Sequence, residues 1–158
     1  ALHRVARDLR PILIDDIDPA IALAGYVSEW GGQAGVAADF HCTDGTLDEI
    51  GEEIRNAIYR IIQEALSNIA KHAYADAVSV IVSRAGGLLR LTIEDNGCGF
   101  DTATAGKRAR EQFTGGLGIA GMRERVILLG GDIEIESAPG AGTTIFVRIP
   151  VEPGKVTA

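Results

Sequence analysis

The sequence has little that would indicate a membrane, secreted or nucleic-acid-binding protein. None of its apolar runs approaches the roughly 20 residues needed to cross a bilayer, and no signal peptide is evident at its start. Its two cysteines, Cys42 and Cys98, form no C-x-x-C motif, so we expect reduced thiols without a disulfide or metal role. The formal net charge of −7 disfavours binding to a phosphate backbone. We therefore expect a cytoplasmic domain that contacts neither nucleic acid nor membrane, with a membrane anchor elsewhere in the intact protein left open.

Glycine is in excess and is unevenly distributed. It makes up 20 of the 158 residues, nearly twice the average share of about 7%, and more than half of these glycines lie between Gly97 and Gly142. A chain of this length with 46% hydrophobic residues suits one globular domain with a sizeable core. We expect the glycine-rich second half to contain most of a ligand site.

The first complete helix is predicted to start at residue 18, after residues 1–17, which have the pattern of a helix end. Asp18 followed by Pro19 is a start signal, because an N-cap side chain and a first-turn proline both favour a helix N-terminus. This helix is expected to reach about Trp30 and to be closed by Gly31 and Gly32.

The longest helix is predicted from a capping box and a long periodic run. Thr46 and Glu49 have the spacing of a capping box, and the helix is expected to extend to about Ala73. Apolar residues recur through it at helical spacing: Ile50, Ile54, Ile58, Ile61, Ile62, Ala65, Leu66 and Ile69.

Five shorter stretches alternate apolar and polar residues, as half-buried strands do. They are residues 36–40, 78–82, 89–93, 133–135 and 145–149, with a further helix from about Gly118 to Leu129. Gly86 and Gly87 separate the second and third stretches and predict a hairpin. Helices must cover one face of such a sheet, so the expected fold is α+β: a two-layer α/β sandwich with a mixed, mostly antiparallel sheet.

Two glycine-rich motifs flank residues 101–114, which lack periodicity and are expected to form a mobile loop. The first, D-N-G-C-G-F, starts with Asp95 at the end of a predicted strand, where its carboxylate can accept a hydrogen bond from an exocyclic amine. The second, G-G-L-G-I-A-G, spans residues 115–121. Glycines let the backbone approach a flat or charged ligand. Either motif alone predicts a tight turn equally well, but together they favour a nucleotide pocket with a movable cover.

A row of polar side chains follows the long helix beside its apolar stripe. Glu64, Asn68, Lys71 and His72 share an arc of roughly 100° at α-helical spacing. Asn68 offers an oxygen to Mg²⁺, Lys71 offers charge to phosphates, and Glu64 could orient or deprotonate a nucleophile. The alternatives are a solvated helix flank with an i, i+4 pair and, for His72, a structural role at the core margin.

The sequence G-L-G-I-A-G, residues 116–121, also matches the dinucleotide fingerprint G-x-G-x-x-G. That fingerprint should follow a buried strand and open a βαβ unit, yet charged residues 107–112 precede it here. We therefore disfavour a dinucleotide site. Glycines at a helix N-terminus still favour phosphate.

Four ordered motifs resemble the GHKL ATPase/kinase superfamily in the form used by bacterial sensor histidine kinases. Residues 64–73 resemble its N box, residues 95–99 its first glycine box, residues 116–121 its second, and residues 140–144 its closing glycine–threonine motif. Residues 121–131 and the L-R-P segment at residues 9–11 are similar to the subfamily that partners LuxR-type response regulators. The resemblance covers nearly all of residues 1–150.

The resemblance implies a Bergerat fold that binds ATP and Mg²⁺. Asp95 would receive the adenine amino group with help from Thr143 through water, Asn68 would hold Mg²⁺, and Lys71 and His72 would lie near the phosphates. Glu64 would be the candidate catalytic base, and residues 101–114 the ATP lid. The further ATP-binding positions are Gly97, Gly99, Gly116, Leu117 and Gly118.

The resemblance also implies a domain organisation. Residues 1–17 would end the dimerisation and phosphoacceptor hairpin, residues 18–151 would form the ATP-binding catalytic domain, and residues 152–158 a flexible tail. The expected function is transfer of the γ-phosphoryl group to a histidine on a dimerisation domain absent from this chain, in a homodimer that signals to a LuxR-type regulator. The alternatives are a GHKL ATPase or anti-sigma-type serine kinase, and a non-catalytic nucleotide-binding module.

Overall fold

A computed structural model of the chain describes residues 18–43, 45–99 and 118–151. The predictions made for residues 1–17, 101–114 and 152–158 lie outside these ranges. The elements, in chain order, are α2 (Pro19–Ala34), β1 (Ala37–Cys42), α3 (Glu52–Asn68), the π-helix η1 (Ile69–Ala73), β2 (Ala77–Ala85), β3 (Leu88–Asp95), α5 (Gly118–Leu128), β4 (Asp132–Ser137) and β5 (Thr143–Pro150).

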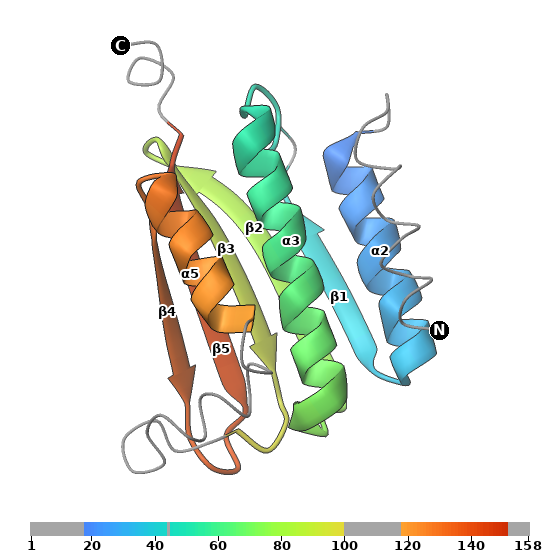
Figure 1. Cartoon of the computed structure of the whole chain (residues 1–158). Helices are drawn as coiled ribbons and strands as arrows, with labels where there is room; N and C mark the ends of the chain where they lie inside the picture. Colours follow the sequence, from blue (N-terminus) through green and yellow to red (C-terminus); the bar gives the residue numbers. More distant parts are fainter. Residues whose placement is uncertain (1–17, 44, 100–117, 152–158) are drawn as a thin grey trace.

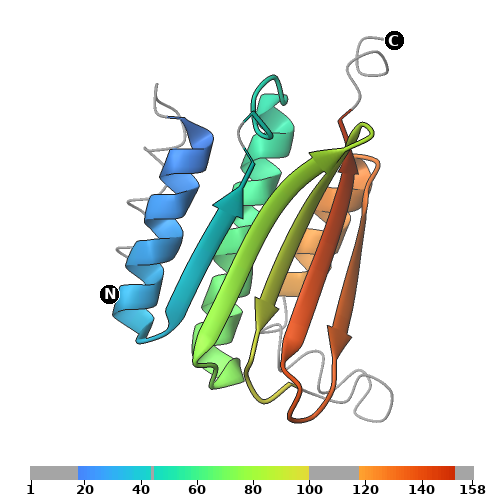
Figure 2. The same ribbon diagram turned by 180° about the vertical axis from the view of Figure 1, so that it is seen from behind.

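The strands form one five-stranded sheet in the order β1-β2-β3-β5-β4. The β1–β2 pair is parallel, whereas β2–β3, β3–β5 and β4–β5 are antiparallel. The parallel pair requires a crossover, which the segment containing α3 provides. Figure 1 shows α2, α3 and α5 in front of the sheet, and Figure 2 shows the opposite face of the sheet without helices. The predicted two-layer α+β sandwich with a mixed, mostly antiparallel sheet is confirmed.

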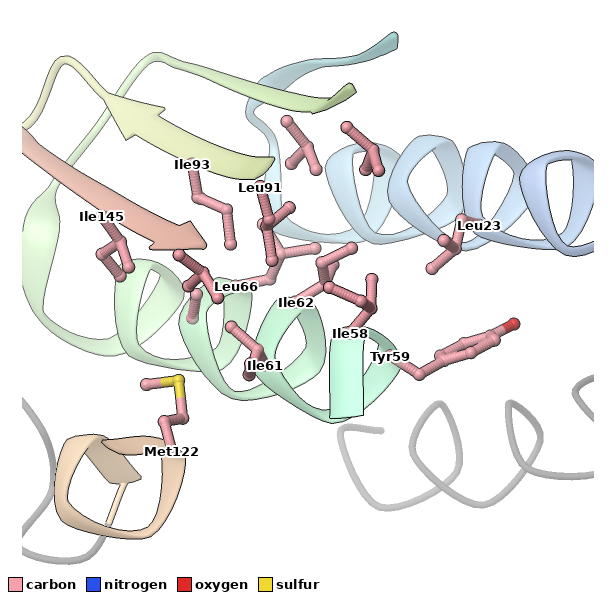
Figure 3. Packing of buried hydrophobic residues seen from close by; sticks show 14 of the residues in the cluster. Leu23, Ile58, Tyr59, Ile61, Ile62, Leu66, Leu91, Ile93, Met122 and Ile145 are labelled. Atoms are coloured by element: carbon pink, nitrogen blue, oxygen red, sulfur yellow. The ribbon is translucent and has the colours of Figure 1, made fainter. Parts of the chain in front are cut away.

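The core lies between α3 and the inward-facing residues of the central strands. Ile61, Ile62 and Leu66 of α3 are fully buried, and Figure 3 shows Ile62 and Leu66 toward Leu91 and Ile93 of β3. Removing each such side chain from water stabilises the fold by about 1.5–3 kcal/mol. The helical and strand periods of the sequence therefore identify the two faces of this core correctly.

The first helix is longer than predicted. Asp18 caps it as expected, because its Oδ1 accepts a hydrogen bond from the Ala20 N–H at 2.9 Å. However, the helix continues through Gly31 and Gly32 to Ala34, and Gly35 ends it in the left-handed conformation with φ of 72°. Gly31 has a packing role instead, since a Cβ there would lie 2.7 Å from the carbonyl oxygen of Val36.

The predicted capping box at the start of the long helix is wrong. The helix begins at Glu52 with Gly51 as N-cap, whereas Glu49 has φ of 59° and lies in a turn. This turn buries Leu47 and Ile50, each only 4% exposed, before the helix starts. Burial of these two apolar side chains therefore overrides the local capping pattern.

The end of the long helix is at Ala73, as predicted, but its last turn is not an α-helix. Residues Ile69–Ala73 form a π-helix. Tyr74 follows it in the left-handed conformation, with φ of 53°. Single π-turns are rare and occur frequently at functional sites, and this one contains two of the residues predicted to face phosphates.

Candidate nucleotide-binding site

The predicted site residues within the described ranges converge on one end of the molecule. Figure 1 shows that the C-terminal end of α3, the end of β3 and the start of β5 all lie at the lower edge of that view. Asp95 and Thr143 are direct partners in the β3–β5 register. Segments separated by many residues along the chain therefore meet at one site.

Asp95 is a buried carboxylate at the end of β3. It is 4% exposed, and its Oδ1 accepts a hydrogen bond from the Gly97 N–H at 2.7 Å. Burial has the largest effect on the Asp95 carboxyl and raises its pKa, and the negative charge of Glu94 raises this pKa further. Hydrogen bonds from the backbone N–H groups of Gly97 and Thr143 lower the pKa, but the net shift is upward. A buried acceptor braced by backbone donors is suited to bind an amine donor that is itself shielded from water.

The position of Asp95 follows from strand periodicity. It is the next inward-facing residue after Leu89, Leu91 and Ile93. Thr143 likewise precedes the inward-facing row of Ile145, Val147 and Ile149. Each apolar row therefore ends in a polar residue on the core side of the sheet, which is a sequence signal for a site at this edge.

Thr143 is 3% exposed, and its Oγ1 lies 2.8 Å from Oγ of Ser137, at the end of β4. The Ser137 hydroxyl also lies 3.1 Å from the carbonyl oxygen of Gly142. Ser137 thus orients the Thr143 hydroxyl and links it to the turn before β5. Ser137 is not a predicted site residue, because nothing in its local sequence distinguishes it from other serines.

Backbone packing requires glycine at three positions around Asp95. A Cβ at Gly97 would overlap the carbonyl oxygen of Ala73, one at Gly99 would overlap that of Ala138, and one at Gly142 would overlap that of Asp95. Gly99 and Gly142 also have φ of 63° and 77°. The first glycine motif therefore lies sandwiched between the end of η1 and the turn before β5.

Asn68 is the last residue of α3 and is 2% exposed. Its Nδ2 has no hydrogen-bond partner within the described part of the chain. Leaving a buried donor unpaired costs about 1–3 kcal/mol, so this amide, at the edge where Asp95 and Thr143 also lie, is a candidate for a ligand contact. The amide fits the predicted role, since its other atom is an oxygen of the kind Mg²⁺ prefers.

The remaining polar residues of the long helix are distributed between the core margin and solvent. Glu64 and His72 are half-buried and Lys71 is exposed. The predicted arc assumed an α-helix throughout, whereas Lys71 and His72 belong to the π-helix η1. The wider turn places Ala73 where its carbonyl oxygen accepts the Cys98 N–H at 2.7 Å.

The second glycine motif is described only in part. Gly116 and Leu117 lie outside the described residues, whereas Gly118 is the first residue of α5. Figure 1 shows this N-terminus pointing toward the same end of the molecule as the end of β3. A helix N-terminus has free N–H groups and a positive dipole end, both of which favour an anion.

Comparisons with known proteins agree with this geometry. A family profile described as histidine kinase-, DNA gyrase B-, and HSP90-like ATPase matches residues 53–153. The signal transduction histidine-protein kinase/phosphatase DegS of Brevibacillus brevis is 35% identical over 151 residues, covering 95% of this chain and 37% of the relative. The oxygen sensor histidine kinase NreB of Staphylococcus carnosus is 31% identical over 150 residues, covering 95% of this chain and 41% of the relative.

Solved structures show the same fold. The histidine kinase domain of the blue-light activated histidine kinase from Erythrobacter litoralis EL346 superposes with a TM-score of 0.65 and 26% identity, covering 85% of this chain and 62% of that one. The chain belongs to the family of histidine kinase-, gyrase B- and HSP90-like ATPases. Within it, the chain corresponds to the catalytic ATPase domain of sensor histidine kinases, which confirms the predicted family and implies nucleotide binding.

The chain spans about two-fifths of the length of these two curated relatives. Across residues 18–43, 45–99 and 118–151, no helix is long and apolar enough to cross a membrane.

Proposed function

We propose that this chain is the ATP-binding catalytic domain of a sensor histidine kinase, and that it transfers the γ-phosphoryl group of ATP to a histidine on a dimerisation domain. The observation that carries the proposal is the buried carboxylate of Asp95, held by backbone donors at the end of β3. Such a group recognises a ligand with a shielded amine donor, which the adenine amino group supplies.

Each predicted residue has a role in this proposal. Asp95 accepts the hydrogen bond of the adenine amino group, and the Thr143 hydroxyl, oriented by Ser137 at 2.8 Å, assists through a water molecule. Gly97 and Gly99 let the loop after Asp95 pack against the backbone of Ala73 and Ala138, which holds that loop in position beside the purine. Gly116, Leu117 and Gly118 present backbone N–H groups to the phosphates.

The helix end holds the polyphosphate. Asn68 binds Mg²⁺ through its amide oxygen, and Lys71 and His72 supply positive charge or hydrogen bonds to phosphate oxygens. When bound, Mg²⁺ neutralises charge on the phosphates. Glu64, half-buried one turn before Asn68, orients the acceptor imidazole or removes its proton, so that the nucleophile points in line with the γ-phosphate.

The proposed organisation of the intact protein follows from this function. Residues 1–17 end the helical hairpin that carries the acceptor histidine, residues 18–151 form the catalytic domain, and residues 152–158 are a tail. The hairpin makes the intact kinase a homodimer, and a LuxR-type response regulator receives the phosphoryl group. The catalytic domain works in the cytoplasm.

Incubation with γ-labelled ATP, alone and with an added dimerisation domain from a kinase of the same subfamily, tests this function. The chain alone should bind ATP without acquiring acid-labile, base-stable label. Its three histidines are His3, His41 and His72; His41 is exposed on β1, and His72 would contact phosphate without accepting it. The added domain should become labelled on its histidine, slowly because no tether raises its effective concentration.

Two results would contradict the proposal. Stoichiometric label on His3, His41 or His72 would place the acceptor within this chain. Tight ATP binding with no transfer to any added dimerisation domain would indicate a non-catalytic nucleotide-binding module.

A further inference from the structure

The side chain of Asn96 is used within the fold, although it belongs to the first glycine motif. Its Oδ1 accepts hydrogen bonds from the Asp76 N–H at 2.8 Å and the Ala77 N–H at 2.9 Å. The Asn96 N–H in turn donates to the Ala77 carbonyl oxygen at 3.2 Å. Asn96 therefore fastens the loop after β3 to the short connection between η1 and β2.

The next residues of the same loop hold the helix end directly. The Cys98 N–H donates to the carbonyl oxygen of Ala73 at 2.7 Å, and the Cys98 thiol donates to that of His72 at 3.6 Å. Gly97 lies so close to Ala73 that a Cβ would overlap its carbonyl. Residues 96–98 thus contact the π-turn and the chain that leaves it.

These contacts connect two parts of the site that rest on different elements. Asp95 and Thr143 are fixed by the β3–β5 ladder, whereas Asn68, Lys71 and His72 lie on α3 and η1. Within the described residues, the hydrogen bonds from this loop to the helix end and the connection after it come from the Asn96 side chain, the backbone of residues 96–98 and the Cys98 thiol. Only the Asn96 contact depends on a side-chain oxygen that a substitution can remove without moving the backbone.

We propose that Asn96 is a positioning residue for the nucleotide: it sets the distance between the adenine anchor and the residues that hold the metal and phosphates. This inference rests on the proposed function. The hydrogen bonds that Asn96 accepts from the Asp76 and Ala77 N–H groups are exposed to solvent. Water can therefore replace the Asn96 oxygen when a substitution removes it. Removing the side chain should therefore loosen the geometry of the site more than it destabilises the fold.

The test compares Asn96→Ala with Asn96→Asp, which keeps an acceptor oxygen at the same place. One measurement is the Kd of Mg²⁺–ATP, which contacts both parts of the site. The other is the Kd of adenosine, obtained by NMR titration, because adenosine contacts only the part on the sheet. Asn96→Ala should weaken Mg²⁺–ATP about tenfold, a loss comparable to one net hydrogen bond, and adenosine less than about twofold. Asn96→Asp should restore Mg²⁺–ATP binding. Asp76→Ala is the matched control, because it changes the same connection but keeps its N–H donor.

Three results would overturn the inference alone, given wild-type protein that binds Mg²⁺–ATP. They are unchanged Mg²⁺–ATP binding by Asn96→Ala, equal weakening of adenosine and Mg²⁺–ATP, and failure of Asn96→Asp to restore binding. Wild-type protein that binds neither ligand would overturn the proposed function and this inference with it.

Discussion

Replacement of Asp95 by asparagine separates the role of this residue in ligand binding from its role in the fold. The amide can keep one oxygen on the Gly97 N–H, which Asp95 now binds at 2.7 Å, but it places an N–H₂ group where a carboxylate oxygen stood. That group opposes the adenine amino group, donor against donor. A hydrogen bond to a charged group is worth about 1.5–3 kcal/mol, and about 1.4 kcal/mol is a tenfold change in Kd. ATP should therefore bind at least about 10- to 150-fold more weakly.

The same substitution should not destabilise the ligand-free fold. Burial raises the pKa of Asp95 above its ordinary 3.8, so the folded protein disfavours the ionised carboxyl relative to the unfolded chain. This cost to folding is absent at pH values below the pKa that Asp95 has in the unfolded chain, and it is complete above the raised pKa that Asp95 has in the folded protein. It therefore lowers the stability of the fold at neutral pH. Since asparagine carries no charge, we expect the Tm of Asp95→Asn without ligand to equal or exceed that of the wild type at pH 7.

Titration calorimetry gives the affinity and thermal unfolding gives the Tm. Glu94→Gln is the matched control: it removes a negative charge from the adjacent residue, whose side chain is exposed on the other face of the sheet, and should leave ATP affinity within about twofold. Unchanged ATP affinity in Asp95→Asn would refute Asp95 as the adenine anchor. A lower Tm together with lost binding would show that the loss arises from a damaged fold.

Two further substitutions test the neighbouring positions. Asn68→Ala should weaken the binding of Mg²⁺–ATP about tenfold but leave the affinity for metal-free ATP within about twofold of the wild type. Calorimetry with Mg²⁺ and with EDTA measures both affinities, and an equal loss in the two conditions would show that Asn68 is only structural. The free energy of unfolding of Asn68→Ala should change little. The substitution loses packing, but it also removes the unpaired Nδ2, whose burial costs about 1–3 kcal/mol. Gly97→Ala should lower the free energy of unfolding by about 1–3 kcal/mol and weaken ATP binding, because its Cβ meets the Ala73 backbone. The control is Gly32→Ala, because a Cβ at Gly32 in α2 meets open space, and its free energy of unfolding, measured in urea, should rise by about 0.5–1 kcal/mol. Equal effects of Gly97→Ala and Gly32→Ala would contradict the close packing of Gly97.

Periodic signals predicted most of the fold. The alternation of residues 78–82 and 89–93 and the helical spacing from Ile54 to Leu66 correspond to β2, β3 and α3, because one face of each element packs on a common core. Signals of one or two residues were less dependable. Gly31 and Gly32 led to a predicted end of the first helix that is too early. Gly31 is required instead by the close approach of the chain that enters β1, and local sequence does not contain this contact.

The π-turn had no sequence signal at all. Residues 69–73 continue the apolar and polar pattern of an α-helix, and the wider turn is seen only in the structure, where Cys98 and Gly97 contact Ala73. The sequence therefore identified Lys71 and His72 as candidates but did not predict the π-helical turn that carries them. Contacts between distant segments decide such details, and spacing along one helix cannot supply them.

The site residues depart from the patterns that build the rest of the core. The buried polar or charged residues of the described ranges are Thr46, Asn68, Asp95 and Thr143, and three of these four are predicted ligand contacts. Burying a polar group without full hydrogen bonding costs stability, whereas the other inward-facing positions of β3 and β5 are apolar. A polar residue that ends an apolar row on its buried side is thus a sequence signal for a candidate binding site, since a ligand can supply the hydrogen bonds that the fold leaves unmade there.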